Sequence, residues 1–509
     1  MKVKFLTIIG LVMFFASCSE YLDQKDPTSL TEEEAYSRLD IVEPLVFGMF
    51  TSWRDLQKDR GGLYFSLGTD ESQQGAYQVT SDPGQAGLDK YNGFLNQENN
   101  SIGGQWNARW PIVNSAALAI RGLSLNTEAD TEKRDLLLGE ASFIRASVMF
   151  ELTQYWGEVP VLDKDHTKEL GWKRQPLPVV YASIIKDLTV AEAKLPETQS
   201  NKSFPTKYLA QALLGKVYLY APQASGVRDY TKAKEWFGKV IASGKYSLLP
   251  SYANNFNYNF ANSAESIYEF QFNNNWPDNN QLQWQTGSRA VANISQNATF
   301  GGYDLILPTM YCYKDKTAGG IWEAGDTRKA ASIRYDFKYR GKTPVLPAGM
   351  GGDELDPHIK KFEDDRIDGT QQFWYSGKNK SYIRYADVLL CYAECLNELG
   401  NTTEAEGIVN QVRQRAFGTL WTPALAWSGL SQVAFRDQIM DERMRELAFE
   451  GWRRMDLIRS GKFVQLIKER NRWAKENGTI AEFHTRYAIP LAEILQNDEI
   501  NPEDQNPGY

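Results

Sequence analysis

The feature of the sequence that most constrains its fold is a long helical stripe between positions 132 and 156. Apolar residues recur there at intervals of three and four, at Leu137, Ala141, Ile144, Val148, Leu152 and Tyr155. This spacing places them on one face of an α-helix. A second stripe runs from Val180 to Leu195, where Pro196 ends it. Each stripe must be buried against another element, so the sequence predicts helices that pack on helices.

Two shorter segments resemble the tetratricopeptide repeat, in which two antiparallel helices cross closely. The first carries Leu214-Gly215, Tyr218, Ala233 and Phe237. The second carries Tyr392-Ala393, Leu396, Ala405 and Val409. Together with the long stripes, they predict a mainly α fold built on a scaffold of tetratricopeptide-like helix pairs.

Between about 250 and 380 the helical stripes give way to a loop-rich texture. Residues 252–304 hold 12 Asn, 5 Gln and 11 aromatic residues, and one short strand is expected at 266–272. The helical pattern returns at 383–398 and 432–459. We therefore expect residues 18–509 to form one unit, with an irregular loop-rich subdomain inserted at about 250–380.

Charge and composition narrow the function. The chain has 56 Lys and Arg against 64 Asp and Glu, a net charge of −8. Nucleic-acid binders need a basic face, so this balance argues against them. Only three histidines are present, and the nucleophile-elbow and zinc-protease motifs are absent from the sequence. We therefore predict no catalytic residue, no metal and no cofactor.

Residues 1–17 are typical of an export signal, with Lys2 and Lys4 followed by a short apolar run. The run ends in Phe15-Ala16-Ser17-Cys18, which resembles a bacterial lipobox. In such signals the chain is cut before the cysteine, which is then acylated, so Cys18 is the expected lipidation site. An ordinary secretory signal cut elsewhere is the alternative.

Three further cysteines, Cys312, Cys391 and Cys395, invite comparison with a metal site. Cys391 and Cys395 share a helical face, but the sequence around them supplies no third or fourth ligand. We therefore expect all three to be buried as small apolar side chains.

Two groups of acidic residues raise the question of catalysis or metal binding. Glu442, Glu446 and Glu450 are spaced by four, so they are expected on one face of one helix. A pair for glycoside hydrolysis is one interpretation, but its carboxyls must flank a substrate. Ion pairing with Arg443, Arg445, Arg453 and Arg454 is the favoured one. For Asp353, Glu354, Asp356 and His358 we favour a solvated loop over a calcium site.

The strongest functional signal is a cluster of aromatic and amide residues. Trp276, Asn279, Asn280, Trp284 and Gln285 fall within ten positions. Aromatic rings stack on the C–H faces of sugars, and amides both donate and accept hydrogen bonds, as hydroxyls do. The segment is therefore a candidate sugar-binding site, and a loop-rich piece of core is the alternative.

Several stretches resemble the motifs of one family. Residues 139–146 match "GEAxFxRA", residues 155–160 match "YxGxVP", and residues 180–188 match "VYxxIIxDL". Residues 383–398 are similar to "IRYADVLLxYAEAxNE", with Cys395 in place of Ala. Residues 442–459 resemble "ERxxELxFEGxRxxDLxR", and the chain ends in "QNPGY". Together they resemble the SusD/RagB family, the surface glycan-binding lipoproteins of Bacteroidetes.

The resemblance implies a lipid-anchored protein of the outer membrane, at the cell surface. It implies capture of oligosaccharide or polysaccharide without cleavage and its transfer to a SusC-type TonB-dependent transporter. Part of the site is implied near Thr69-Asp70-Glu71 and in the loop to Tyr91-Asn92. Combining this with the aromatic cluster, the candidate glycan-binding residues are Asp70, Tyr77, Tyr91, Asn92, Trp276, Asn279, Trp284, Tyr303 and Trp322. Peptide capture, as in some RagB relatives, and an extracellular glycosidase are the alternatives.

Overall fold

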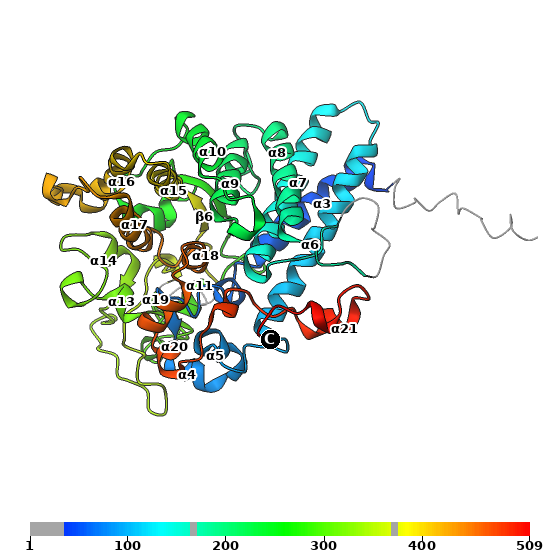
Figure 1. Ribbon diagram of the computed structural model, residues 1–509. Coiled ribbons are helices and arrows are strands. Elements are labelled where there is room, and N and C mark those ends of the chain that lie inside the picture. Colours follow the sequence, from blue (N-terminus) through cyan, green and yellow to red (C-terminus); the bar gives the residue numbers. More distant parts are fainter. Residues whose placement is uncertain (1–34, 163–170, 368–374) are drawn as a thin grey trace, which may run out of the picture.

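The structure is a computed structural model that describes residues 35–162, 171–367 and 375–509. Paired helices form its scaffold, and those of the first half of the chain pack side by side (Figure 1). They are α3 (Leu39–Asp55), α6 (Asn100–Leu125), α7 (Thr131–Trp156), α8 (Leu177–Lys194), α9 (Lys207–Tyr220) and α10 (Tyr230–Ala242). A second group packs beside α9 and α10 and consists of α15 (Tyr385–Glu398), α16 (Thr402–Phe417) and α17 (Gln432–Leu447). The mainly α fold predicted from the stripes is confirmed.

Both tetratricopeptide-like segments form the helix pairs that their spacing predicts. In the first pair, a Cβ added at Gly215 of α9 would lie 2.6 Å from the ring of Phe237 on α10. Only glycine leaves room for that ring, so this residue sets how closely the two helices approach. In the second pair, Leu396 of α15 packs with Ala405 and Val409 of α16 in one buried cluster.

Two of the predicted helical segments differ from the structure: one is broken in the middle, and the other begins later than predicted. The segment 432–459 is two helices, α17 and α18 (Arg453–Arg459), and the chain turns between them with positive φ angles at Phe449 and Gly451. Glu450 therefore lies outside the helix that carries Glu442 and Glu446. Ile383 and Arg384 belong to a strand, β6 (Lys380–Arg384), which pairs with β2 (Ser266–Phe270).

Short helices and two-stranded ribbons make up the loop-rich subdomain together with the segment 72–90, which pairs with it. The pair formed by β1 (Ser72–Gln74) and β3 (Ile306–Pro308) is antiparallel, with Gln74 opposite Ile306. The segment after Gln74 and the segment before Ile306 therefore leave the ribbon at the same end. The remaining elements are α4 (Ala76–Ser81), α5 (Pro83–Lys90), α11 (Leu282–Thr286), α12 (Arg289–Ala292), α13 (Met310–Tyr313), α14 (Arg328–Ser332), β4 (Ile333–Arg334) and β5 (His358–Ile359).

The C-terminal segment returns across the molecule to the end of α7. The Asn506 side chain donates to the backbone oxygens of Trp156, at 2.8 Å, and Tyr487, at 2.7 Å. The closing sequence motif is thus a structural clamp. The short helices of this segment are α19 (Phe463–Arg470), α20 (Arg472–Asn477) and α21 (Leu491–Gln496).

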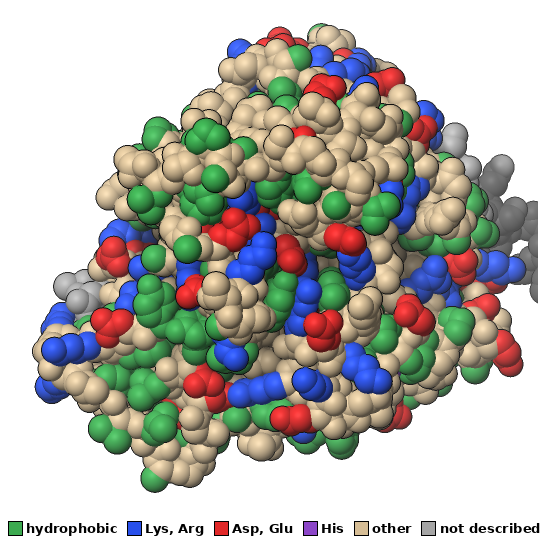
Figure 2. All heavy atoms as spheres, turned by 60° about the vertical axis from the view of Figure 1, so that its left-hand side comes forward, with side chains coloured by type: hydrophobic (Ala, Val, Ile, Leu, Met, Phe, Trp, Pro, Cys, Tyr) green, Lys and Arg blue, Asp and Glu red, His purple; other side chains and the backbone are tan. Residues whose placement is uncertain are grey.

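The surface carries mixed charge. Figure 2 looks onto the side that holds α14 and α16, where Lys and Arg are interspersed with Asp and Glu. This side offers no broad area of a single positive sign, which a phosphate backbone would require. Among the described helices, none is both long and apolar enough to cross a bilayer.

Candidate functional site

Aromatic and cationic side chains gather at the end of the β1–β3 ribbon. The ring centres of Trp284 and Tyr303 lie 5.6 Å apart, with the rings tilted by 54°. The guanidinium carbon of Arg289 lies 4.5 Å from the centre of the Tyr303 ring and 4.4 Å from that of Tyr77. The guanidinium carbon of Arg60 lies 5.8 Å from the centre of the Tyr303 ring. Three of the predicted ligand-binding aromatics thus meet in one place.

The ribbon explains why Tyr77 and Tyr303 meet, although 226 positions separate them in the sequence. Tyr77 comes shortly after Gln74, and Tyr303 comes shortly before Ile306. Because Gln74 pairs with Ile306 in the antiparallel ribbon, the two tyrosines lie at the same end of it. The Tyr303 backbone is then held on two sides: its N–H donates to the Trp284 oxygen at 2.8 Å, and its oxygen accepts from Gln78 at 2.7 Å. The tyrosines therefore stand on fixed backbone.

Arg289 is fixed from behind by a buried acid. Its Nε and its backbone N–H both donate to the carboxylate of Asp304, at 3.2 and 2.9 Å. The His358 Nε2 atom lies 2.9 Å from the same carboxylate. The Nη2 atom of Arg289 also donates to the Tyr303 backbone oxygen at 3.0 Å. Arg289 therefore holds its guanidinium between two tyrosine rings, an arrangement that favours a cation.

Trp276 extends this surface. Its side chain is 67% exposed, and the Lys58 ammonium lies 6.0 Å from its ring centre. The Lys58 backbone oxygen accepts from Gln281 N–H at 2.6 Å, which joins this segment to the one that carries Trp284. We call the surface the aromatic face; it consists of Tyr77, Trp276, Trp284 and Tyr303 with the cations Lys58, Arg60 and Arg289.

The aromatic face has the chemistry of a carbohydrate platform. Half-buried and exposed rings can stack on sugar C–H faces, and the burial of their edges fixes their orientation. Guanidinium and ammonium groups can donate hydrogen bonds to hydroxyl or carboxylate oxygens.

Four other predicted site residues are buried and engaged inside the protein. Tyr91 donates its hydroxyl to the Gly68 oxygen at 2.6 Å, and burial raises the pKa of that hydroxyl. Trp322 donates its indole N–H to the Cys312 oxygen at 2.5 Å. Asn279 is 2% exposed, and Asp70 is completely buried. Each of these four residues is at most 2% exposed, so we do not include them in the surface formed by the exposed and half-buried rings.

Asn92 also lies apart from this group. It is half-buried at the end of α5, and its side-chain oxygen accepts from the Phe94 N–H at 3.2 Å. It serves to close a turn, and we do not include it in the aromatic face.

The carboxylates of α17 belong to a buried ionic network. Glu446 accepts from Arg415 at 2.5 Å, Arg384 at 3.0 Å and Arg328 at 3.1 Å. Burial by itself would raise the pKa of Glu446, but these three guanidinium groups lower it to about 2. Glu442 is paired in the same way, with Arg328, Arg413 and Arg445. The predicted ion pairing is confirmed.

Most partners in this network differ from those predicted. Arg445 pairs with Glu442 as expected, but Arg453 pairs with Asp70, and Glu450 pairs instead with Arg384 and Lys361. The break after α17 removes Glu450 from the helical spacing on which the prediction depended. The arginines that neutralise these acids come from distant elements.

The remaining sequence candidates also lie in the interior. Cys312, Cys391 and Cys395 are buried, as expected. In the acidic segment Asp356 is exposed, as expected of a solvated loop, but Asp353, Glu354 and His358 are buried, which corrects the expectation for these three. Asp353 accepts from Ala76 N–H at 2.9 Å, and Glu354 accepts from two backbone N–H groups. Cys18 lies outside the described residues.

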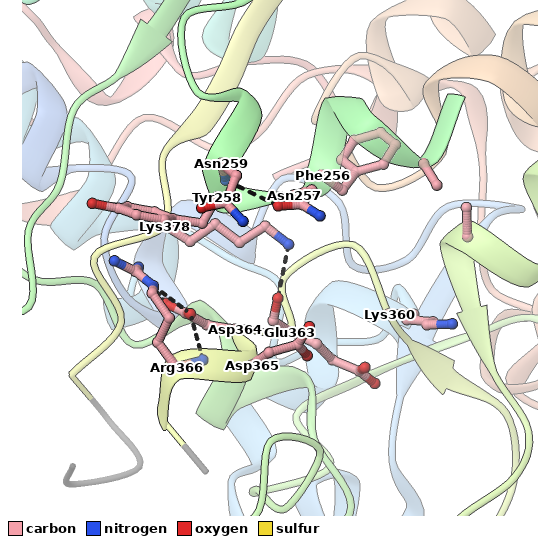
Figure 3. A pocket seen from close by; sticks show the side chains of 12 residues that line it. Phe256, Asn257, Tyr258, Asn259, Lys360, Glu363, Asp364, Asp365, Arg366 and Lys378 are labelled. Carbon is pink, nitrogen blue, oxygen red and sulfur yellow. Dashed lines mark hydrogen bonds and ion pairs between the residues drawn. The ribbon is translucent and has the colours of Figure 1, made fainter. Parts of the chain in front are cut away.

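A charged pocket of about 330 Å³ opens beside the short turns at 252–260 (Figure 3). Tyr258 at its edge stacks on Arg366, whose guanidinium carbon is 3.2 Å from the ring centre. Arg366 in turn donates two hydrogen bonds to Asp364, and Lys378 donates to the Glu363 oxygen at 2.8 Å. The described lining of this pocket holds two rings, Phe256 and Tyr258, against four in the aromatic face, so the aromatic face is the better platform for a sugar.

Comparison with known proteins places the chain in a family. A model described as the SusD family matches residues 245–509, which is more than half of the chain. The chain belongs to the SusD family. A second model, described as "Starch-binding associating with outer membrane", matches residues 20–219.

Individual relatives within the SusD family are distant but similar over most of their length. SusD-like protein P2 of Formosa agariphila is 28% identical over 547 aligned residues, which cover 100% of both chains. The starch-binding protein SusD of Bacteroides thetaiotaomicron is 24% identical over 75% of this chain and 74% of its own. The crystal structure of a SusD homolog from that species has a TM-score of 0.78 at 22% identity, covering 94% and 98% of the two chains.

Residues of the SusD-family motifs build the scaffold rather than the aromatic face. Arg145 of the "GEAxFxRA" helix pairs with Asp187 of the next motif through two hydrogen bonds of 2.6 and 2.7 Å. This pair joins α7 to α8. The motifs therefore identify the fold, and they carry no information about which ligand is bound.

Sequence reasoning missed the cations of the site. Lys58 and Arg60 lie outside the loop-rich insertion, and Arg289 lies within it but carries no motif of its own. Their contact with the rings depends on the tertiary fold, because each comes from a segment distant in sequence from at least one ring that it contacts. No local spacing predicts such contacts.

Proposed function

We propose that this protein captures oligosaccharide or polysaccharide at the cell surface through the aromatic face. The observation that carries the proposal is the group formed by Tyr77, Arg289, Tyr303 and Trp284, with ring and guanidinium centres 4.4–5.6 Å apart. Membership of the SusD family and the starch-binding function in the name of the relative from B. thetaiotaomicron support it.

The proposal includes an anchor and a transporter. Cys18 would carry the lipid that holds the protein on the outer membrane, and a SusC-type TonB-dependent transporter would receive the glycan. The support is the lipobox-like sequence before Cys18, the outer-membrane association in the description of the second family model, and the family resemblance.

Binding without cleavage is also part of the proposal. Hydrolysis of a glycosidic bond needs two carboxyl groups that flank the substrate. Glu442 and Glu446 are instead buried among arginines, and the pKa of each is lowered, so neither is available as a general acid. The aromatic face offers rings and cations for binding.

The decisive experiment is a glycan array followed by titration calorimetry on the protein without its lipid. Losing one stacked ring removes about 0.5–1.5 kcal/mol beyond area burial, so we expect Trp284→Ala/Tyr303→Ala to weaken binding at least tenfold. Tyr335→Ala is the matched control, because Tyr335 is an exposed tyrosine, 54% accessible, outside the aromatic face. Equal affinity in both variants would refute the site, and binding of peptides in place of glycans would favour the peptide-capture alternative.

A further inference from the structure

A second pocket, of about 560 Å³, is lined by residues of α6 and α21 and of the loops beside them. The two helices lie near each other in Figure 1. The volume of the pocket lies within the range of about 300–1,000 Å³ typical of small-molecule sites. No residue of the aromatic face lines it. We call it the amide pocket, after lining residues that include Asn107, Trp110, Asn114, Trp172, Gln496 and Asn497.

The α6 wall of the amide pocket is one face of a regular helix. Asn107, Trp110 and Asn114 are spaced by three and four, so they point the same way. Trp110 packs edge to face on Trp106, with ring centres 5.2 Å apart, and Trp106 packs on Trp156 at 5.3 Å. The half-buried Trp110 ring is therefore supported by two buried indoles.

The opposite wall is tied to α6 through one carboxylate. Glu493 of α21 accepts from the Trp106 indole N–H at 3.2 Å and from the Asn497 side chain at 2.7 Å. Asn497 exchanges two hydrogen bonds with the backbone of Trp172, at 2.9 and 3.1 Å. The Trp110 ring and the backbone of Trp172 are thus held in place before any ligand arrives, which lowers the entropy cost of binding.

The chemistry of the lining selects an uncharged ligand rich in hydroxyl groups. Two half-buried indoles offer apolar faces, and the exposed Asn107, Asn114 and Gln496 offer amides that both donate and accept. Among the described residues that line the pocket there is no Lys or Arg, so the described lining offers no cation for a sulfate or a uronate. Glu493 is the one acid among these described residues, and each of its oxygens already accepts a hydrogen bond.

A peptide suits this place less well. Extended peptides bind by adding a strand to an open sheet edge, and no strand is among the described elements that line this pocket. We propose that the amide pocket is a second binding site, for a neutral oligosaccharide, separate from the aromatic face. The inference rests on the proposed function for its ligand class. Two sites on one chain would raise the avidity for a long polysaccharide that reaches both.

Calorimetry with three variants tests this inference, using maltohexaose, laminarihexaose, xylohexaose and mannohexaose as probes. The first variant, Trp284→Ala/Tyr303→Ala, disables the aromatic face. The second variant carries these two changes together with Asn107→Ala/Asn114→Ala. The third variant carries Trp284→Ala/Tyr303→Ala together with Trp172→Ala. The control adds Gln411→Ala/Gln414→Ala, which removes two exposed amides from α16 instead.

We expect wild type to bind at least one probe at two sites, and the first variant to keep one of them. Removing the two pocket amides or the Trp172 ring should weaken that residual binding about tenfold or more, while the α16 control leaves it unchanged. Asn107 and Asn114 are exposed, so replacing them by Ala should not lower the melting temperature. The second variant therefore still tests the pocket if the Trp172→Ala protein unfolds.

Two results would overturn the inference. The first is that the first variant loses all glycan binding, or that its residual affinity is the same after every change in the amide pocket. The amide pocket is then no glycan site, while the proposed function stands. If wild type binds none of the probes and no glycan on the array, the proposed function fails, and this inference fails with it.

Discussion

Asp70 and Arg453 form a completely buried ion pair across 383 positions of sequence, with two hydrogen bonds of 2.6 and 2.7 Å. Arg470 adds a third bond to the same carboxylate at 2.9 Å. Burial disfavours the charged form, yet the two arginines outweigh it and lower the pKa of Asp70. The pair ties the segment before β1 to α18, so Asp70 belongs to the frame that carries the aromatic face.

Replacing Asp70 should therefore change stability and leave ligand affinity unaltered. Asp70→Asn leaves the Arg453 guanidinium buried without its counter-charge, which typically costs about 3–5 kcal/mol. Guanidinium unfolding followed by circular dichroism measures the loss. Asp498→Asn, at an exposed position of the C-terminal segment, is the control and should stay within about 0.5 kcal/mol of wild type.

The same Asp70→Asn protein should bind glycan with the wild-type Kd below its unfolding temperature. A large increase in Kd with little loss of stability would return Asp70 to the binding site.

Two tryptophans expected in the site should behave in opposite ways. Trp276 is 67% exposed, so Trp276→Ala should weaken glycan binding while the melting temperature hardly moves. Trp322 is 1% exposed, so Trp322→Ala should cost about 3–5 kcal/mol of stability. Calorimetry and a thermal melt on both proteins distinguish ring stacking from core packing; an unstable Trp276→Ala protein with unchanged Kd would contradict the first half.

Arg289 should act by positioning the tyrosines. Arg289→Lys keeps the charge but loses the planar fork that bonds Asp304 and the Tyr303 oxygen together. We expect glycan affinity to fall about three- to tenfold, and Arg289→Met to lower it further. Arg38→Lys, which alters a surface pair with Asp40, is the matched control. Equal Kd values for Arg289→Lys and wild type would show that Tyr77 and Tyr303 need no such support.

Glu71 should make stability depend on pH. Burial raises the pKa of its carboxyl to about 8, despite the nearby Arg453, whereas an unfolded Glu has a pKa of about 4.3. The folded state therefore holds a proton that the unfolded state releases between these values. The contribution of Glu71 is fully present below about pH 4.3 and is lost as pH rises to about 8, by about 1.4 kcal/mol per unit.

Glu71→Gln removes this titration and keeps an acceptor for the Phe449 N–H, which now donates to Glu71 at 3.2 Å. The free energy of unfolding, measured at intervals from pH 5 to pH 8, should fall less steeply in the variant than in wild type. Glu503→Gln changes an exposed acid and should follow the wild-type curve. Parallel curves for Glu71→Gln and wild type would mean that Glu71 ionises normally.

The lipid anchor is tested at Cys18. Cys18→Ala removes the thiol that acylation requires, so the protein should leave the membrane fraction and appear in the medium. Mass spectrometry of the mature amino terminus checks the modification directly. An unmodified amino terminus in the wild-type protein would refute the anchor.

Local spacing was sufficient to determine much of this protein. The helical scaffold and the family could be predicted from the stripe at Leu137–Tyr155, the pair Gly215 and Phe237, and the motif residues Arg145 and Asp187. These signals are local because helix periodicity and close helix packing depend on residues that lie close together in the sequence. The aromatic composition of residues 252–304 also pointed to the segment that supplies three rings of the aromatic face, Trp276, Trp284 and Tyr303.

Only the tertiary structure decided which of those residues face solvent. Trp276 and Trp322 were both candidate ligand-binding tryptophans, yet Trp276 is 67% exposed and Trp322 is 1% exposed. The partners of Glu446 and the cations beside Tyr303 come from distant segments that meet only after the helices and ribbons have packed. Burial and long-range ion pairs are properties of the whole packed chain, so no local pattern in the sequence contains them.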